Sequence, residues 1–437
     1  MAQQLLWTPH NSFFKTIQSR TTPHRLVVDP RSRSTNPHPN SPLPSINLSD
    51  HRPPNHKKTP TTTTTTTVAT AMTPPPNPSP LPPPPPFYWG DTPEQQFYSS
   101  QGVRNSKSYF ETPNGKLFTQ SWLPADENQP IKAVVFMTHG YGSDSSWCFQ
   151  KICIEYAKWG YAVFAADLLG HGRSDGLHGY LGDMDKVASS LLLYFLSVRR
   201  SEIYCKLPAF LFGESMGGMI TMLVYFQSEA ATWTGLIFSA PLFVIPENMI
   251  PSKLHLTMYG LLFGFADTWA AMPDNKMIGK AIRDPEKLKI IAVNPKRYVG
   301  KPRVGTMREV VRVTNYIQNN FHKVTAPFLT LHGTSDGVTC PTGSQLLYEK
   351  ASSEDKSLKL YDGMYHSLVQ GEPDDAANLV LADMRAWIDE KTEKYGRKTD
   401  GFRFSFFIYI NLYVKRTICI FFTLSPSSFF TPLSLSF

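Results

Sequence analysis

The chain of 437 residues carries 43 lysines and arginines against 35 acidic residues, a net charge of +8, with 37 prolines and 5 cysteines. An odd number of cysteines at scattered spacings argues against a disulfide framework and favours a reducing compartment. No Cys-x-x-Cys pair or histidine cluster has metal-ligand spacing, so we expect neither a metal nor a cofactor. The middle of the chain has no basic stripe with interleaved aromatic residues, which argues against a nucleic-acid partner.

Residues 1–86 differ in composition from the rest of the chain. They contain much of the proline, a run of seven threonines at 61–67, and eight lysines and arginines against two acidic residues. Such a segment cannot bury enough apolar surface to offset the entropy of ordering it, so we expect a disordered extension. A basic organellar transit peptide, or sequence that precedes a natural start at Met72, are the alternatives. We expect a cytoplasmic protein, with organellar import and association with a membrane as alternatives.

Residues 399–437 form a second unusual segment, rich in Phe, Ile, Leu and Ser with almost no acidic residues. Its apolar run at 404–414 is shorter than the roughly 20 residues of a membrane-spanning helix, and Lys415 and Arg416 interrupt it. We expect this apolar tail to lie outside the fold. The alternative is a membrane anchor, which would bring the protein into peripheral contact with a membrane.

Residues 87–398 alternate short apolar, β-rich runs with longer amphipathic segments, which predicts a mostly parallel sheet flanked by helices. We expect strands at 133–137, 162–166, 209–212, 236–238, 328–331 and 358–361, and helices at 147–159, 185–200, 219–227 and 374–394. The interval from about 241 to 322 breaks this alternation with helical patterns, repeated prolines and many methionine and aromatic residues. We interpret it as a helical cap, inserted at the sheet edge where loops build the site.

The pentapeptide Gly-Glu-Ser-Met-Gly at 213–217 lies between an apolar run and a helical pattern. A Gly-x-Ser-x-Gly at a strand-to-helix turn lifts the serine hydroxyl out of the sheet, and its glycines let neighbouring chain approach closely. Ser215 is therefore the predicted nucleophile. The main-chain N–H of Met216, at the start of the helix, is one predicted oxyanion donor, and that of Tyr141, in the loop His-Gly-Tyr-Gly at 139–142, is the other.

A serine nucleophile needs a base and an acid that orients the base. In this architecture the two partners follow the serine in the chain, each on a loop after a later strand. The strand at 328–331 leads into Asp336, and the strand at 358–361 leads into His366. We therefore predict that His366 is the base and Asp336 the orienting acid. Asp362 also ends a strand, but it lies too close in sequence to His366 to orient it.

Other polar residues near these strand ends are interpreted as structural. Asp167 begins a turn that we expect to be held by its own polar contacts, and His171 is interpreted as a loop histidine. His332 precedes a glycine at a strand end, where we expect it to make a backbone contact. His139 and Asp144 match the His-x-x-x-x-Asp pattern of glycerolipid acyltransferases, but the predicted oxyanion loop already accounts for His139.

Three motifs together resemble the monoacylglycerol lipase branch of the α/β-hydrolase superfamily: residues 139–142, Gly-His-Gly-Arg-Ser at 170–174, and Gly-Glu-Ser-Met-Gly-Gly at 213–218. Longer strings at 104–110, 236–246 and 266–273 resemble plant esterases of that branch. The similarity covers about residues 83–398, and the strings in the cap are far more specific than the serine motif. The two ends of the chain do not resemble the family.

The resemblance implies an α/β-hydrolase domain over 87–398, with a helical cap at about 241–322 after the sixth strand. The family's triad falls on Ser215, Asp336 and His366. It also implies hydrolysis of caffeoyl shikimate to caffeate and shikimate, a step in lignin precursor synthesis. The expected partner is thus a small-molecule ester, with no obligate protein partner.

Two other functions remain open. A monoacylglycerol lipase or lysophospholipase would use the apolar cap residues as an acyl channel; these are Met258, Tyr259, Leu261, Leu262, Phe263 and Phe265. A catalytically inactive hydrolase fold that binds a ligand is the third class, although the three triad positions are intact. A shikimate ester carries a carboxylate, for which Arg303, Arg308 and Arg312 are candidate contacts, with solvated helix-face charge as the ordinary alternative.

Overall fold

A computed structural model describes residues 87–245, 266–270 and 278–396. All of them belong to one of the two units into which the chain divides, Pro80–Phe437. The predictions for residues 1–86 and 399–437, and for the apolar cap residues 258–265, lie outside the described residues.

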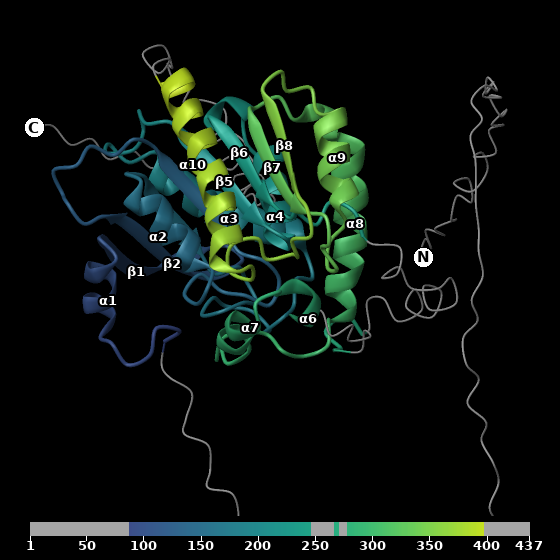
Figure 1. Ribbon diagram of the computed structural model, residues 1–437. Helices are drawn as coiled ribbons and strands as arrows, with labels where there is room; N and C mark the ends of the chain where they lie inside the picture. Colours follow the sequence, from purple (N-terminus) through teal and green to yellow (C-terminus); the bar gives the residue numbers. More distant parts are fainter. Residues whose placement is uncertain (1–86, 246–265, 271–277, 397–437) are drawn as a thin grey trace, which may run out of the picture. The chain divides into compact units, whose positions relative to one another are not determined.

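An eight-stranded sheet with the order β1-β2-β4-β3-β5-β6-β7-β8 forms the centre of this unit (Figure 1). From β4 to β8 neighbouring strands are parallel, whereas β2 pairs antiparallel with both β1 and β4. The predicted fold class, a mostly parallel sheet flanked by helices, is confirmed. The strands are β1 (Val103–Thr112), β2 (Gly115–Pro124), β3 (Val134–Thr138), β4 (Ala162–Ala166), β5 (Ala209–Glu214), β6 (Gly235–Ser239), β7 (Phe328–Gly333) and β8 (Lys356–Tyr361).

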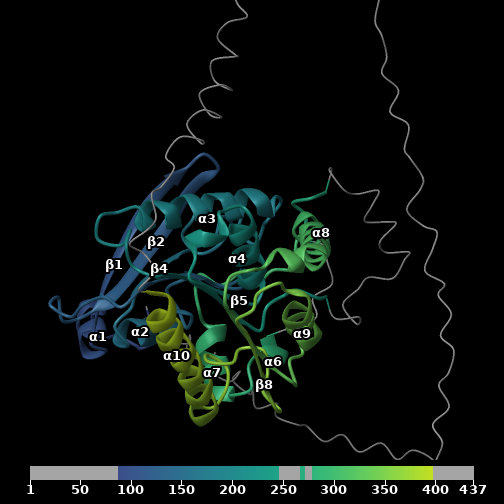
Figure 2. The same cartoon turned by 90° about the horizontal axis from the view of Figure 1, so that it is seen from above.

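Helices cover both faces of the sheet (Figure 2), with α3 and α4 on one side and α2 and α10 on the other. The helices are α1 (Glu94–Ser100), α2 (Gln150–Lys158), α3 (Met184–Arg199), α4 (Met216–Phe226), α6 (Ile278–Ala281), α7 (Pro285–Ala292), α8 (Val304–Asn320), α9 (Pro341–Lys350) and α10 (Asp374–Gly396), with 3₁₀ turns at Ala230–Thr232 and Phe321–Lys323.

Two apolar cores result from the alternation of side chains along each strand. In β3, Val134 and Phe136 belong to the core beneath α3 and α4, whereas Val135 and Met137 belong to the core beneath α2 and α10. Both faces of the central strands are therefore buried. Such strands are apolar at every position, which is why the sequence shows them as continuous apolar runs.

The chain between β6 and β7 is helical over most of its described residues, with α6, α7, α8 and a 3₁₀ turn. A helical insertion after the sixth strand, part of the predicted fold class, is thus confirmed, while its limits at 241 and 322 stay a prediction. Helix α7 begins where the sequence provides a cap, because Asp284 Oδ1 accepts from the main-chain N–H of Glu286 at 2.9 Å, with Pro285 in the first position. In Figure 1, α6 and α7 lie beneath the sheet, at the end where α10 begins.

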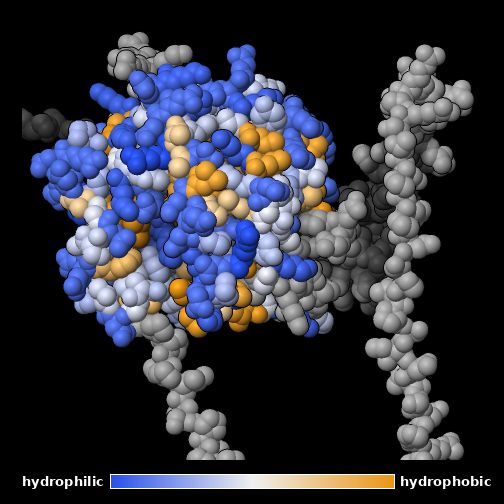
Figure 3. Space-filling view, in the orientation of Figure 1, coloured by the Kyte–Doolittle hydropathy of each residue, from blue (hydrophilic) through white to orange (hydrophobic). Residues whose placement is uncertain are grey.

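Exposed apolar side chains are scattered over the surface. On the face shown in Figure 3, hydrophobic residues form small groups separated by hydrophilic ones. The exposed apolar residues include Leu379 on α10 and Leu360 on β8, with 54% and 41% of their surface exposed. Scattered exposed residues of this kind are ordinary on globular proteins. Over residues 87–245, 266–270 and 278–396, none of the helices is both long and apolar enough to cross a membrane.

Candidate active site

Ser215 occupies the sharp turn between β5 and α4. Its backbone has φ 56° and ψ −126°, a conformation that costs free energy in any residue with a side chain. Neighbouring residues pack closely against the turn. A Cβ on Gly213 would lie 2.5 Å from Thr221 Oγ1, and one on Gly217 would lie 2.4 Å from the main-chain oxygen of Thr138. Both glycines of the motif are therefore required by space, and the turn presents Ser215 at the carboxyl edge of the sheet.

The loop after β3 runs beside the nucleophile. A Cβ on Gly140 would lie 3.2 Å from Ser215 Cβ and 3.6 Å from Ser215 Oγ. Tyr141 follows directly, and its hydroxyl donates to the main-chain oxygen of Gly179 at 3.0 Å, which anchors its ring. Met216, on the other side of the nucleophile, is buried as the first residue of α4. The two predicted oxyanion donors thus lie on chain that flanks Ser215, and their role stays a prediction.

The loops after β7 and β8 bring Asp336 and His366 together. His366 Nδ1 lies 2.7 Å from Asp336 Oδ2. The other carboxylate oxygen of Asp336 accepts from the main-chain N–H groups of Val338 and Thr339 at 2.7 and 2.9 Å. The two loops are also joined by main chain, since Ser335 N donates to the oxygen of Met364 at 3.0 Å. These contacts leave the carboxylate few orientations other than the one that faces His366.

The electrostatics of this pair favour a charged acid and a basic imidazole. Burial alone would raise the pKa of Asp336, but the charge of His366 and the hydrogen bonds from His332 and His366 hold that pKa well below its usual range. Burial alone would lower the pKa of His366, but the carboxylates of Asp336 and Glu214 raise it above its ordinary value. Asp336 is thus an anion that can stabilise the imidazolium form of His366.

Several residues near the pair were not predicted from the sequence. Thr339 Oγ1 donates to Asp336 Oδ2 at 2.7 Å. His332 was expected to make a backbone contact, and it does form a hydrogen bond with the main chain of Thr339. Its buried side chain also places Nε2 3.1 Å from Asp336 Oδ2, a contact that was not expected. Glu214, next to the nucleophile, is also buried and accepts from Gln370 Nε2 at 3.0 Å. Of these residues, only His332 could have been found from the sequence, because it is a polar residue at the end of a strand, four positions before the acid Asp336.

The residues interpreted as structural have other partners. Asp167 accepts from the main-chain N–H groups of Ser145 and Arg173 at 2.7 and 2.8 Å, so its turn is held by local polar contacts as expected. His139 Nδ1 contacts the oxygen of Gly140 at 2.8 Å, while its Nε2 accepts from the main-chain N–H of Leu168 at 3.0 Å. Neither ring nitrogen of His139 is left to act as the base of an acyltransferase.

Asp144 and Asp362 also have partners, and His171 is unsuited to act as a base for a different reason. Asp144 Oδ2 accepts from Asn294 Nδ2 of the insertion at 2.7 Å, and Asp362 Oδ1 accepts from Thr334 Oγ1 at 3.1 Å. Burial, with the neighbouring His139, lowers the pKa of His171 to about 3, so this ring is a poor base at neutral pH.

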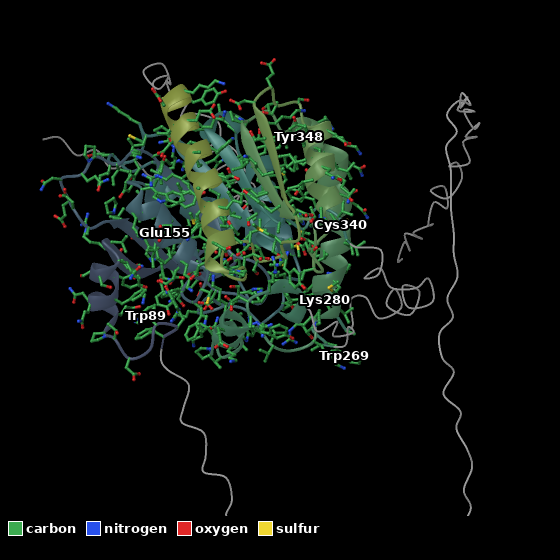
Figure 4. The ribbon with its side chains drawn as sticks, viewed as in Figure 1. Trp89, Glu155, Trp269, Lys280, Cys340 and Tyr348 are labelled. Atoms are coloured by element: carbon green, nitrogen blue, oxygen red, sulfur yellow. The ribbon has the colours of Figure 1, made fainter. Side chains whose placement is uncertain are left out.

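The insertion contacts all three loops of the site. Ala281, at the end of α6, accepts from Ser367 N at 2.9 Å, in the loop that carries the histidine. Gly142, in the loop after β3, accepts from Tyr298 N at 2.9 Å. Lys280 lies against the acid loop, because a Cβ on Gly337 would be 3.0 Å from Lys280 Cβ. Figure 4 labels Lys280 on α6 and Cys340 at the start of α9, on the same side of the molecule.

The three candidate arginines of the insertion are tied to protein groups. Arg308 pairs with Asp267, Arg312 Nη2 lies 2.7 Å from Asp185 Oδ2, and Arg303 Nε donates to the main-chain oxygen of His178 at 3.0 Å. These contacts give each arginine a structural role in joining the insertion to the rest of the domain. In the described part of the chain, no group of three His, Cys, Asp or Glu residues could hold a metal ion.

Comparison with known proteins assigns the chain to a family. The family model described as serine aminopeptidase, S33, matches residues 129–374. Caffeoylshikimate esterase of Arabidopsis thaliana is 72% identical over 312 residues, which cover 71% of this chain and 93% of that protein. Human monoglyceride lipase is 28% identical over 287 residues, covering 64% of this chain and 89% of the lipase.

A solved structure agrees on the fold. A soluble variant of monoglyceride lipase from Saccharomyces cerevisiae, in complex with a substrate analog, superposes with a TM-score of 0.56 at 23% identity. The match covers 65% of this chain and 94% of the lipase. From the sequence relationships and this shared fold together, the chain belongs to the serine aminopeptidase S33 family of α/β-hydrolases, in the branch that holds caffeoylshikimate esterase and the monoglyceride lipases.

Proposed function

We propose that the protein is a serine carboxylester hydrolase that cleaves caffeoyl shikimate to caffeate and shikimate through an acyl-serine intermediate. The substrate follows from the 72% identity to caffeoylshikimate esterase over 93% of that protein. The reaction type follows from a single structural observation, the 2.7 Å contact between His366 Nδ1 and Asp336 Oδ2 at the edge of the sheet that also presents Ser215.

The chemistry begins with attack of Ser215 Oγ on the ester carbonyl carbon, while His366 Nε2 takes the hydroxyl proton. Asp336 holds Nδ1–H of His366, which fixes the tautomer that leaves Nε2 free to accept, and stabilises the imidazolium. The main-chain N–H groups of Met216 and Tyr141 donate to the carbonyl oxygen as it becomes negative.

The tetrahedral intermediate then breaks its bond to the alcohol oxygen, which leaves as shikimate with the proton from His366. Water repeats the cycle on the caffeoyl-serine. His366 takes a proton from the water, hydroxide adds to the acyl carbon, and the proton returns to Ser215 Oγ as caffeate departs. The enzyme ends in its starting state, and the net change is addition of one water across the ester bond.

The carboxylate of the shikimate group needs a cationic contact, and we propose Lys280 for it. This exposed side chain on α6 lies against Gly337, next to Asp336, so it can reach a group bound at the mouth of the site. We expect Lys280→Met to raise KM for caffeoyl shikimate and to leave KM for methyl caffeate, which lacks the carboxylate, unchanged. An equal effect on both esters would contradict this contact.

The proposed reaction is tested by comparing kcat/KM for caffeoyl shikimate, a monoacylglycerol, a lysophospholipid and an aminoacyl amide. We expect caffeoyl shikimate to be preferred, with Ser215→Ala as the inactive control. A preference for either lipid would assign the protein to lipid hydrolysis, the function of the monoglyceride lipase relatives by name, and would make peripheral membrane contact worth testing. A preference for the amide would favour the peptidase activity in the family description.

A further inference from the structure

Asp336 is contacted by a second imidazole, that of His332, which the proposed mechanism does not use. His332 Nε2 lies 3.1 Å from Asp336 Oδ2, the same oxygen that His366 Nδ1 contacts at 2.7 Å. The two imidazoles come from different elements, because His332 lies in β7 and His366 lies in the loop after β8. The side chains of His332 and Asp336 are both fully buried. One carboxylate oxygen thus contacts two imidazoles.

The neighbours of His332 determine which of its ring nitrogens carries the proton. Ser344 Oγ, in α9, lies 2.8 Å from His332 Nδ1, and Thr330 Oγ1 donates to the same serine oxygen at 2.9 Å. Because the Ser344 hydroxyl accepts from Thr330, its own proton is available for Nδ1. The proton of the neutral imidazole then resides on Nε2, where it is donated to Asp336.

The charges around this group are consistent with a neutral His332. Burial lowers the pKa of His332, although Asp336 acts in the opposite direction. Among the described residues, the titratable groups that face Asp336 are His332 from β7 and His366 from the loop after β8. Glu214, at the end of β5, acts on His366, and Lys280 of α6 lies against the acid loop at Gly337. His332 therefore offers Asp336 a polar N–H rather than a second positive charge.

We propose that His332 is a positioning residue for the triad, whose Nε2–H holds Asp336 Oδ2 against His366 and shares the charge of that oxygen. The inference rests on the proposed function, since it assigns a purpose to the orientation of Asp336. Without this N–H, Asp336 keeps its contacts to Val338 and Thr339 through Oδ1 but loses one anchor of Oδ2. The charge of Oδ2 is then shared only by His366 and the Thr339 hydroxyl, which raises the pKa of His366 further.

Three variants of the full-length protein and one control test the inference. His332→Leu removes the donor at similar volume, His332→Gln restores an N–H near the position of Nε2, and Ser344→Ala removes the hydroxyl that fixes the tautomer. Ser353→Ala is the matched control, a buried serine that bonds locally to the main-chain oxygen of Asp355 before β8. For each variant, kcat and KM for caffeoyl shikimate are measured from pH 5 to 9.

We expect His332→Leu to lower kcat about ten- to a hundredfold, the effect of one hydrogen bond to a charged group, with KM nearly unchanged. The acidic limb of its kcat/KM profile should move to higher pH. His332→Gln should restore most of the activity, Ser344→Ala should fall between, and Ser353→Ala should match the wild type. In ¹⁵N spectra, His332 of the wild type should show a protonated Nε2 and an unprotonated Nδ1.

Either of two results would overturn the inference. One is a His332→Leu variant with the wild-type kcat and pH profile. The other is equal loss in the Leu and Gln variants with an unmoved acidic limb and a lower melting temperature, which would make His332 a packing residue only. Failure of the proposed function is a separate outcome, because it would appear as activity that survives Ser215→Ala or as no activity on caffeoyl shikimate in the wild type.

Discussion

The two halves of the candidate site are held in different ways. The nucleophile turn between β5 and α4 depends on backbone proximity: glycines at 213 and 217 have no room for a Cβ, and Ser215 N donates to the main-chain oxygen of Ser239 at 2.9 Å. The acid and histidine loops also meet through main chain, at Ser335 and Met364, but their functional groups are oriented largely by side chains. A single oxygen of Asp336, Oδ2, contacts the side chains of His332, Thr339 and His366.

This difference determines what a substitution can do in each half. At the nucleophile turn, an added methyl group collides with main-chain atoms. The main chain must then move, so a substitution there disturbs the whole turn. In the acid and histidine loops, loss of a side chain removes one contact of several. The effects of substitutions there are therefore graded, and they appear first in the orientation of Asp336 and the pKa of His366. The predictions below test that contrast, from the largest expected effect to the smallest.

Ser215→Ala should give the largest loss. The nucleophile has no substitute in the turn, so we expect kcat for caffeoyl shikimate to fall by roughly a millionfold. The fold should survive, because Ala removes only the hydroxyl from a turn held by main-chain contacts. Labelling with a fluorophosphonate probe, measured beside kcat and circular dichroism, checks both parts. Substantial turnover by the variant would reject Ser215 as the nucleophile.

Asp336→Asn should have the next largest effect. The amide cannot carry the charge that stabilises the His366 imidazolium, and it favours the wrong tautomer, so we expect kcat to fall by about ten-thousandfold. Because Asp336 raises the pKa of His366, the residual activity should have its acidic limb at lower pH than the wild type. Unchanged kcat would show that another acid, such as Asp362, orients the base.

Gly217→Ala tests the backbone half of the site. Its Cβ would lie 2.4 Å from the oxygen of Thr138 and 2.5 Å from that of His139, and both are main-chain atoms that cannot rotate away. The loop after β3 must therefore move, which displaces the predicted oxyanion donor at Tyr141. We expect kcat to fall by about a hundredfold, the usual scale for a misplacement of that size, with the His366 pH limb unmoved. A variant with normal kcat would contradict the steric account of the turn.

The same contrast explains what the sequence predicted. The parallel strands were predictable because burial on both faces makes every position apolar. The nucleophile turn was predictable because the residues that the turn requires, two glycines around a serine, are close together in the sequence. Asp336 could be placed because it follows a strand of this kind, β7. His366 follows β8, which is only partly buried, and it could be placed from the short apolar pattern at 358–361.

The missed features depend on residues distant in sequence or on weak local patterns. Thr339, Ser344 and His332 are ordinary residues whose contacts exist only once β7, α9 and the loop after β8 meet. The β1–β2 hairpin was missed because β1 is mostly polar and β2 mixes polar with apolar residues. Its signal was the turn at Pro113 and Asn114, where Thr112 pairs with Gly115. Gly115 has φ 133°, which a glycine adopts readily.

The pH profile of the wild type should reflect the electrostatics of the side-chain half. Asp336 and Glu214 raise the pKa of His366, so this base stays protonated, and unable to accept the Ser215 proton, up to a higher pH than an ordinary histidine. We expect kcat/KM to fall about tenfold per pH unit below a midpoint that lies above about 6.5. Glu214→Gln should lower that midpoint. A wild-type midpoint below the ordinary histidine value would contradict the assignment.

The contact between Asn294 and Asp144 tests whether the backbone half also depends on the insertion. Asn294 Nδ2 donates to Asp144 Oδ2 at 2.7 Å, and both side chains are buried. Asn294→Ala would leave a buried carboxylate oxygen without this partner, so we expect the free energy of unfolding to fall by about 1–3 kcal/mol. Urea denaturation measures the change. If kcat falls as well, the loop after β3 takes part of its position from the insertion.

The smallest effect is expected for an ion pair far from both halves. Arg104 Nη1 lies 2.6 Å from Glu127 Oε1 at the β1–β2 end of the sheet, with side chains 43% and 75% exposed. Glu127→Ala removes the pair but keeps the bond from Arg104 Nε to the oxygen of Pro124. An exposed pair contributes little after solvent screening, so we expect a change of about 0.5 kcal/mol or less in urea denaturation and no change in kcat. The Arg104–Glu127 contact is as short as the contacts around Asp336. A normal kcat in Glu127→Ala would therefore show that the loss of an ion pair is not enough to lower kcat. The effects expected in the acid and histidine loops would then come from the burial and position of those groups. A lower kcat would show instead that the two halves of the site respond to the far edge of the sheet, and the contrast between them would then be a property of the whole domain.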